Sequence, residues 1–525
     1  MNKPIGLTGG HTTGSPGIAE SVEKRGTIRF LMPILGVLVS CLTSWLTHDS
    51  LTDDAYITLA AARNLAENLH WGVIDAATAN TSTSPLNVLL LGSIAYLTRV
   101  FDGSTDPQFS LYLLNALCGA LIGWALGSIA RSISVGSFAT ATAILLVQLN
   151  PFVLSAIGLE VLLIPAVLLS MTALGLRMSS NDRRAGVQFG LATGAAVLTR
   201  LDLVVFAAAF FICAPAVRAK WKIVLPAALI AGGPWFMASW LWLGSAIPDT
   251  FLIKEGQATD VGGYNYATGP EMFAWSQPLA TSAAFIPALL GLAITALWLI
   301  VPIIRHKIPV ALWTLGFGGV AYYGAYSALN TVPYHWYYVT PLVSLTTVAI
   351  LGTVAVSKGR TAVWPFGVIM GTALLALTVT ANSQNGFPWR SPVIFGNWAS
   401  AQDYARVGGA VGQIVGDSPV RSPGEIGTLA YFCDCTIVDE FSDRGLIIRD
   451  RLLPRLAEAS GVERFLLRLN YSNLDYSQQP ITPAYRLDYV EAPDAPQPPL
   501  NGARQWVWPV YSASRGDGFL ILTST

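Results

Sequence analysis

Long apolar segments alternate with short polar turns over most of the chain. The first segment covers residues 30–46 and follows a polar tail, residues 1–27, which ends near Lys24 and Arg25. Because a helix needs about 20 apolar residues to cross the hydrocarbon core of a bilayer, this pattern predicts membrane-spanning helices. The later segments cover residues 85–97, 109–130, 138–154, 161–176, 187–198, 201–214, 223–243, 281–301, 310–328, 336–356 and 363–380. We therefore expect a polytopic α-helical membrane protein.

Basic residues mark one set of turns between these segments. By the positive-inside rule, those turns and the tail of residues 1–27 are cytoplasmic. The basic residues are Arg131, Arg177, Arg183, Arg184, Arg218, Lys220, Lys222, Arg305, Lys307, Lys358 and Arg360. Loops 48–84 and 244–280 then lie on the outer face of a membrane domain of residues 28–381. Segment 85–97 is short for a full span, so we expect it to be strongly tilted or to enter halfway, leaving about eleven full crossings.

The last part of the chain, residues 382–525, has a different character. It is polar and rich in Pro, contains no lysine and lacks an apolar run of 18 residues. An odd number of crossings places it outside the cell membrane as a soluble domain of about 140 residues, an ordinary domain size. Strand-like stretches at 436–438 and 518–522, with a helical stretch at 450–459, predict an α/β or mostly β domain.

The composition supports the membrane assignment and excludes other classes. Hydrophobic residues make up 53% of the 525 residues and charged residues only 12%, about half the charged share of soluble proteins. The formal net charge is zero, which gives no overall attraction to nucleic acid. The five Cys and five His show no zinc-ligand spacing. Cys433 and Cys435 are too close in sequence for an ordinary bridge, so we expect neither a metal staple nor a disulfide framework.

Two adjacent carboxylates, Asp53 and Asp54, follow the first predicted span. An acidic side chain at a bilayer boundary is costly when it is dehydrated, so a pair at this place is a candidate functional site. Apolar residues recur at helical spacing over residues 55–69, with Arg63 among the polar positions. This pattern predicts an amphipathic helix along the membrane interface.

Further polar residues share the outer face with this acidic pair. They are Glu160, Arg200, Asp202, Lys254, Tyr334, His335 and Trp336. A carboxylate can take a proton from a hydroxyl group, a cation can hold a phosphate leaving group, and aromatic rings can stack on sugars. The set therefore favours a site for a sugar carried on a lipid phosphate.

Each of these residues also has a simpler structural interpretation. Asp53 is a suitable N-cap for the helix that follows it. Glu160 and Arg200 are compatible with a structural ion pair between two helical hairpins, and Lys254 with a lysine that snorkels to the interface. The aromatic run 334–338 is typical of an interfacial belt. The shared sidedness of the residues is what favours a site.

Seven stretches of the chain resemble, in this order, the GT-C fold family of membrane glycosyltransferases. They read DDAYITLAAARNLAEN, TSTSPLNVLLLG, NPFVLSAIGLEVLL, VLTRLDLVVF, IPDTFLIK, YHWYYVTPL and GEIGTLAYFCDCTIVDEFSDRGLI. The chain looks most like the terminal arabinofuranosyltransferases of mycobacterial cell-wall assembly. The resemblance implies an inverting transfer of a sugar, with arabinofuranose as the first choice, from polyprenyl phosphate to a cell-envelope glycan on the outer face.

The resemblance also implies roles for the candidate residues. An Asp of the first outer loop serves as the base, which maps onto Asp53 or Asp54; Asp53 is our first choice. Lys254 and Arg200 are expected to hold the donor phosphate. The resemblance further implies that Glu160 lines the substrate cavity and that His335 and Trp336 face it. Arg63, Asp202 and Tyr334 are substrate-binding candidates from their place on the outer face.

The expected partners are the lipid donor, the glycan acceptor and the bilayer. No cofactor is required by this reaction. A divalent cation near Asp53 and Asp54 is compatible with the pattern, but two adjacent Asp residues are too few to establish a site. Two other functions fit the pattern less well. One is a protein O-glycosyltransferase of the same fold, and the other is a transporter of lipid-linked sugars, which often shows internal repeats that we do not find here.

Overall fold

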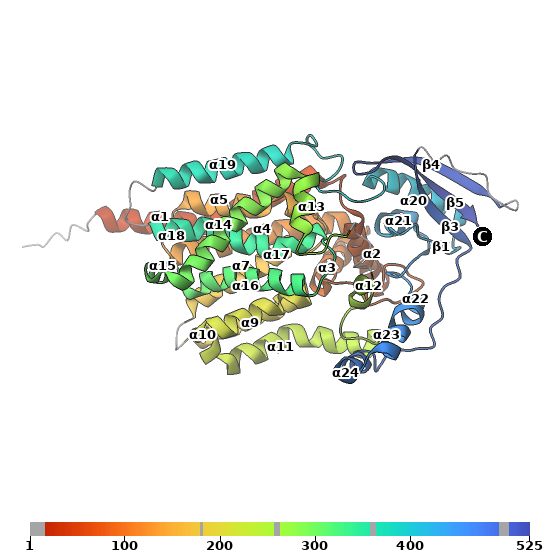
Figure 1. Ribbon diagram of the computed structural model, residues 1–525, viewed down its shortest axis with the longest axis horizontal. Coiled ribbons are helices and arrows are strands. Elements are labelled where there is room, and N and C mark those ends of the chain that lie inside the picture. The colour runs from red at the N-terminus through yellow and green to blue at the C-terminus, as the bar shows by residue number, and fades with distance from the viewer. Residues whose placement is uncertain (1–15, 179–181, 257–262, 358–363, 493–502) are drawn as a thin grey trace, which may run out of the picture.

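The computed structural model describes residues 16–178, 182–256, 263–357, 364–492 and 503–525. Helices α1 to α19 form an elongated bundle, and the remaining elements form a C-terminal domain at the end of the bundle far from the start of α1 (Figure 1). The predicted polytopic helical fold with a C-terminal α/β domain is therefore confirmed.

The bundle contains helices of very different length. They are α1 (Pro16–Thr47), α2 (Asp53–Asn68), α3 (Pro85–Asp102), α4 (Pro107–Ser132), α5 (Ser137–Gln148), α6 (Pro151–Leu154), α7 (Leu163–Arg177), α8 (Arg183–Thr199), α9 (Val204–Cys213), α10 (Pro215–Ala219), α11 (Trp221–Ala238), α12 (Thr250–Gly256), α13 (Gly269–Ser276), α14 (Pro278–Ile300), α15 (Pro302–Lys307), α16 (Val310–Ala328), α17 (Val339–Thr347), α18 (Thr353–Ser357) and α19 (Trp364–Asn382). Short 3-10 or π-helical turns join some of them, namely η1 (Leu201–Leu203), η2 (Ser239–Leu243), η3 (His335–Tyr338) and η4 (Val348–Gly352).

Within the described residues, five helical stretches are long and apolar enough to cross a membrane. They are Phe30–Thr47, Pro107–Ser132, Trp221–Leu243, Pro278–Ile300 and His335–Ser357. Four shorter apolar helices accompany them, at Ser137–Gln148, Leu163–Arg177, Leu201–Cys213 and Gly367–Asn382. The figure of eleven crossings stays a prediction.

Two helices at the start of the chain differ from the expected elements. α1 begins at Pro16, so part of the predicted tail is helical, while residues 1–15 lie outside the described residues. The segment 85–97 belongs to the 18-residue helix α3, which packs against α2 and α4.

Close packing of α1 on α4 depends on glycine. A Cβ atom at Gly36 would overlap the carbonyl oxygen of Gly119, so only a residue without a side chain lets the two backbones approach this closely.

The C-terminal domain is built on a five-stranded mixed sheet. Its helices are α20 (Ala401–Val415), α21 (Gly427–Cys433), α22 (Arg444–Ile447), α23 (Leu453–Glu458) and α24 (Gly461–Asn470), with a π-helical turn η6 (Ile448–Leu452). Its strands are β1 (Val420–Arg421), β2 (Ile437–Val438), β3 (Tyr485–Glu491), β4 (Gln505–Ser512) and β5 (Gly516–Ser524), in the order β2-β1-β3-β5-β4. β1 pairs in parallel with β2 and β3, and the other pairs are antiparallel.

The core of this domain reaches the bundle through α2. Tyr404 and Val407 of α20 pack with Leu487 and Leu520 of the sheet, and Ala60 of α2 belongs to the same buried cluster. The domain is therefore packed directly onto the helix that carries the acidic pair.

Candidate active site

The acidic pair occupies the first turn of α2, where the bundle meets the C-terminal domain. Thr52 holds the N-cap position of α2. Its hydroxyl group donates to Oδ1 of Asn397 (3.0 Å), which also accepts the N–H of Asp53 (3.2 Å). The first turn of α2 is thus satisfied from the C-terminal domain, and the interpretation of Asp53 as the N-cap of its own helix is wrong.

Asp53 turns its carboxylate away from α2 and onto the first turn of α21. The N–H groups of Gly427 and Thr428 donate to its two oxygens at 2.9 and 2.7 Å. The residue is only 4% exposed, and this burial raises the pKa of Asp53 although the N–H donors at Thr428 and Gly427 oppose the shift. Asp53 therefore caps a helix, but the helix belongs to the other domain.

Asp54 points in a different direction and lines an open pocket with a cavity volume of about 50 Å³. Polar side chains of Thr81, Ser82 and Thr83 share its wall with Lys254. Burial raises the pKa of Asp54 to about 6, with opposing stabilisation of the charged form by the Lys254 ammonium. A carboxyl group with a pKa near neutrality is a better proton acceptor than an ordinary Asp.

Lys254 lies in an aromatic cage formed at η3. Its Nζ donates to the hydroxyl group of Tyr337 at 2.8 Å. It also lies 5.2, 5.7 and 5.1 Å from the ring centres of Tyr334, Trp336 and Tyr337, within the range of cation–π attraction. The rings of Tyr334 and Trp336 stack on each other at 4.6 Å. The cage holds a positive charge at the pocket wall.

Arg200 is enclosed by two carboxylates behind this cage. Its Nη1 contacts Glu160 at 2.5 Å and its Nη2 contacts Asp202 at 2.6 Å. The same Nη2 donates to the hydroxyl group of Tyr326 (3.0 Å), and the guanidinium lies 5.1 Å from the ring centre of Tyr337. The ion pair between Glu160 and Arg200 that the structural interpretation predicted is therefore present.

Tyr337 joins the two cations, and our sequence-based selection of site residues missed it. Its hydroxyl oxygen accepts a hydrogen bond from Lys254, and its ring face contacts the guanidinium of Arg200. Tyr337 follows Tyr334 by three residues, and residues three apart share a face of a helical turn. This spacing could have identified Tyr337 as a candidate from the sequence.

His335 lies on the inner side of the same turn. It is 8% exposed, and its Nε2 lies 3.2 Å from the carbonyl oxygen of Ser155. Its ring also packs edge-on against Phe152. His335 therefore contacts the bundle interior, whereas the ring of Trp336 forms part of the cage around Lys254.

Comparison with known proteins identifies the fold. No family model and no curated protein sequence matches the chain. Among solved structures, the oligosaccharyltransferase of Archaeoglobus fulgidus, crystallised with a tethered acceptor peptide, matches with a TM-score of 0.52 and 12% identity over 88% of this chain and 69% of its own. ArnT from Cupriavidus metallidurans bound to undecaprenyl phosphate matches with a TM-score of 0.52 and 13% identity over 94% and 97%.

A third similar structure is the arabinofuranosyltransferase AftD from Mycobacteria, with a TM-score of 0.53 and 14% identity over 94% of this chain but 41% of that protein. These similar structures are GT-C glycosyltransferases. The chain has the GT-C fold.

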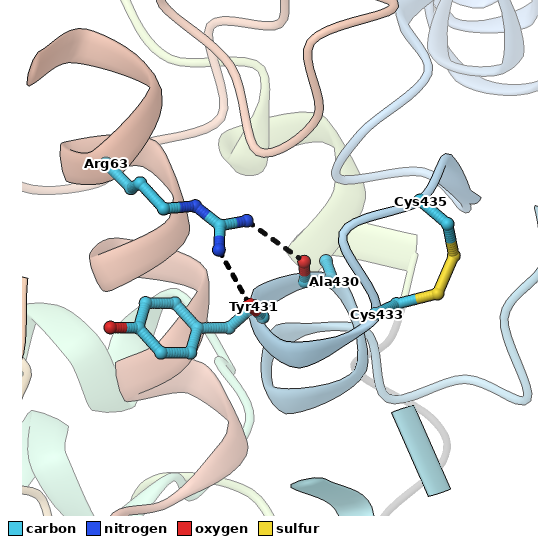
Figure 2. Close-up of a disulfide and its surroundings, with 5 residues drawn as sticks. All are labelled: Arg63, Ala430, Tyr431, Cys433 and Cys435. Atoms are coloured by element: carbon cyan, nitrogen blue, oxygen red, sulfur yellow. Dashed lines mark hydrogen bonds between the residues drawn. A yellow bond between two sulfur atoms is a disulfide. The ribbon is translucent and has the colours of Figure 1, made fainter. Parts of the chain in front are cut away.

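A second contact across the two parts of this GT-C chain involves Arg63 of α2. Its Nη1 donates to the carbonyl oxygen of Tyr431 (2.8 Å) and its Nη2 to that of Ala430 (3.4 Å), as Figure 2 shows. The guanidinium also lies 5.1 Å from the ring centre of Tyr431. Asp53 thus binds the amino end of α21 and Arg63 its carboxyl end, each opposite to the partial charge of that end. Arg63 contacts the C-terminal domain, and it is not among the residues that line the Asp54 pocket.

The expectation that Cys433 and Cys435 do not pair is wrong. They form a disulfide at the carboxyl end of α21, whose last residue is Cys433 (Figure 2). Asp434 between them has a φ of 53°, and this left-handed turn brings the two Cα atoms to 5.1 Å, within the usual range for a bridge. The bridge closes the end of α21 beside the carbonyl groups that Arg63 holds.

A metal site is not evident at the acidic pair. In the parts of the chain that the structure describes, no three His, Cys, Asp or Glu side chains come together as metal ligands. The oxygens of Asp53 are already used by two N–H groups. A divalent cation beside Asp53 and Asp54 therefore stays a prediction that the structure does not test.

Proposed function

We propose that this protein is an inverting glycosyltransferase that moves a sugar from a polyprenyl phosphate to a glycan acceptor. The observation that carries the proposal is the pairing of Asp54, with its raised pKa, and the caged Lys254 in one pocket at the end of a GT-C bundle. Two of the similar structures are complexes with lipid phosphates, with dolichol-phosphate bound to the archaeal AglB and undecaprenyl phosphate to ArnT. Arabinofuranose, the sugar named for AftD, is the first donor to test.

In the proposed reaction Asp54 is the base. Its carboxylate removes the proton from an acceptor hydroxyl group while that oxygen attacks the anomeric carbon of the donor sugar. The bond between the anomeric carbon and the phosphate oxygen breaks, and its electron pair leaves with the polyprenyl phosphate. The proton stays on Asp54 until it passes to water. One displacement inverts the anomeric centre, and no covalent enzyme intermediate is needed.

Lys254 holds the leaving phosphate in this scheme. Among the described residues, its hydrogen-bond partner is the Tyr337 hydroxyl group, and the ammonium group has three hydrogens to donate. We assign the phosphate to Lys254 rather than to Arg200, because the charge of Arg200 is already balanced by Glu160 and Asp202. Arg200 then acts as a positioning residue that fixes Tyr337.

The acceptor has a second cavity available. A polar cleft with a cavity volume of about 860 Å³ lies in the C-terminal domain, and Phe441 lines both this cleft and the Asp54 pocket. The hydroxyl group of Thr81 donates to the carbonyl oxygen of Phe441 (2.8 Å), so the two cavities share a wall. Arg421 and Asp488 line the cleft and suit sugar hydroxyl groups, which both donate and accept hydrogen bonds. We place the distal sugars of the acceptor there.

The test is transfer by purified protein in detergent from a synthetic polyprenyl-phosphate arabinofuranose to a short oligosaccharide. Asp54→Asn preserves the shape and removes the base, so we expect a loss of activity of about 10²- to 10⁴-fold. Asp53→Asn is the matched neighbour and should retain much more activity. Equal turnover by wild type and Asp54→Asn would reject Asp54 as the base.

The alternatives give different results in the same experiment. A protein O-glycosyltransferase would ignore the oligosaccharide and modify a peptide acceptor. A transporter would bind the lipid and give no product with any donor or acceptor.

A further inference from the structure

Helix α24 exposes an apolar face that nothing in the C-terminal domain covers within the described residues. Its sequence, GVERFLLRLN, places Val462, Phe465, Leu466 and Leu469 at positions i, i+3, i+4 and i+7, which share one side of a helix. Their exposed fractions are 73, 64, 55 and 49%. Four large apolar side chains on one exposed helix face indicate an interaction surface.

The opposite side of α24 fixes the helix to the protein near the candidate site. Leu467 packs against a small buried cluster that contains Leu252 and Leu474. Leu252 belongs to α12, the helix that carries Lys254. α24 is therefore held through Leu467, and its apolar face points outward.

Hydrogen bonds hold α24 beside the end of a candidate membrane span. Trp240 of η2 donates its ring N–H to the carbonyl oxygen of Leu469 (3.0 Å), and Asn470 accepts the N–H of Ile247 (2.8 Å). η2 ends the stretch Trp221–Leu243, a candidate span of which only 22% is buried. Figure 1 shows α24 beside the end of α11 that faces the C-terminal domain.

The exposed surface of this span continues onto α24. Leu241 and Trp242 of η2 are 53 and 81% exposed, and tryptophan is the residue that gathers at membrane interfaces. The exposed face of α24 therefore begins where the exposed face of a membrane helix ends. A second protein chain at this place would have to displace lipid from the span as well.

We propose that α24 lies in the membrane interface and inserts Val462, Phe465, Leu466 and Leu469 among lipid chains, so that the C-terminal domain is anchored beside α12. Helices with a strongly apolar face and charged flanks bind membranes in this way. Glu463 and Arg468 supply such flanks on either side of the apolar face. This proposal does not depend on the glycosyltransferase reaction.

The test is photo-crosslinking of the full chain in nanodiscs of phosphatidylethanolamine and phosphatidylglycerol. One protein carries p-benzoylphenylalanine in place of Phe465. The control carries it in place of Tyr511, an aromatic residue that is 55% exposed. Tyr511 belongs to β4, a strand that lies away from α24 (Figure 1). We expect about tenfold more lipid adduct at position 465 than at position 511, detected by mass spectrometry.

A second substitution separates insertion from simple nearness to lipid. Leu466→Glu, added to the protein labelled at position 465, should lower the lipid adduct about tenfold, because a carboxylate opposes insertion of the face. The melting temperature should hardly change, since Leu466 is more than half exposed. Equal adduct yields at positions 465 and 511, an unchanged yield in the Leu466→Glu protein, or adducts between two protein chains would overturn the proposal.

Discussion

Replacing Asp53 by Ala removes the acceptor for two backbone N–H groups at the start of α21. Those groups, on Gly427 and Thr428, donate at 2.9 and 2.7 Å to a carboxylate that is buried between the two parts of the protein. A hydrogen bond to a charged group contributes about 1.5–3 kcal/mol, and loss of a helix cap costs about 0.5–2 kcal/mol. Because both bonds belong to one cap, we expect α21 to open more easily by about 2–3 kcal/mol.

Hydrogen–deuterium exchange measures this change locally. Each 1.4 kcal/mol is a tenfold change in an equilibrium, so the first amides of α21 should exchange about 30- to 140-fold faster in Asp53→Ala. The readout is a peptide containing Gly427 and Thr428, analysed by mass spectrometry on the full chain in detergent.

The neighbouring residue gives a matched control. Asp54→Ala removes a carboxylate from the same turn of α2, but among the described residues Asp54 forms no hydrogen bond to α21. Protection of the α21 amides should therefore stay as in wild type. Exchange in Asp53→Ala within about threefold of wild type, or equal acceleration in both variants, would refute the assignment of Asp53 as the cap of α21.

Three further predictions concern the pocket and its support. Since the pKa of Asp54 is raised to about 6 and the base is the deprotonated form, kcat/KM should be level above pH 7 and fall about tenfold from pH 8 to pH 5; a level profile down to pH 5 would exclude Asp54. Lys254→Gln should lower kcat/KM at least about tenfold and move this decline to higher pH, because the ammonium lowers the pKa of Asp54, while Lys222→Gln should do neither. In the wild type, the guanidinium of Arg444 lies 3.0 Å from the buried carboxylate of Asp249. Arg444→Ala leaves this carboxylate without its cation, which should lower the free energy of unfolding by about 3–5 kcal/mol and lower the melting temperature. An unchanged melting temperature would contradict this.

The fold could be predicted from the sequence because its signals are local. Apolar runs, helical spacing over 55–69 and the polar character of 382–525 each depend on neighbouring residues. The same is true of the α/β domain, where the expected strand at 518–522 corresponds to β5 (Gly516–Ser524).

The different environments of Asp53, which binds α21, and Asp54, which lines the pocket, could not be predicted. The N–H groups that bind Asp53 come from residues 374 and 375 positions later in the chain. No pattern near residue 53 indicates whether these groups bind Asp53 or Asp54. The disulfide was missed for a related reason, because it depends on the left-handed conformation of Asp434.

The contact of Asp53 with α21 also sets an order for biogenesis. A ribosome adds about 5–20 residues per second, so α2 exists for roughly 20–75 s before the segment that binds its first turn has been made. A Cβ atom at Gly427 would overlap the carbonyl oxygen of Asp53. The backbone of α21 therefore packs directly against the backbone of α2 at this glycine. Until α21 arrives, the newly inserted bundle carries an unmatched acidic turn at its surface, and the last quarter of the chain completes a site whose first residues were translated at the beginning.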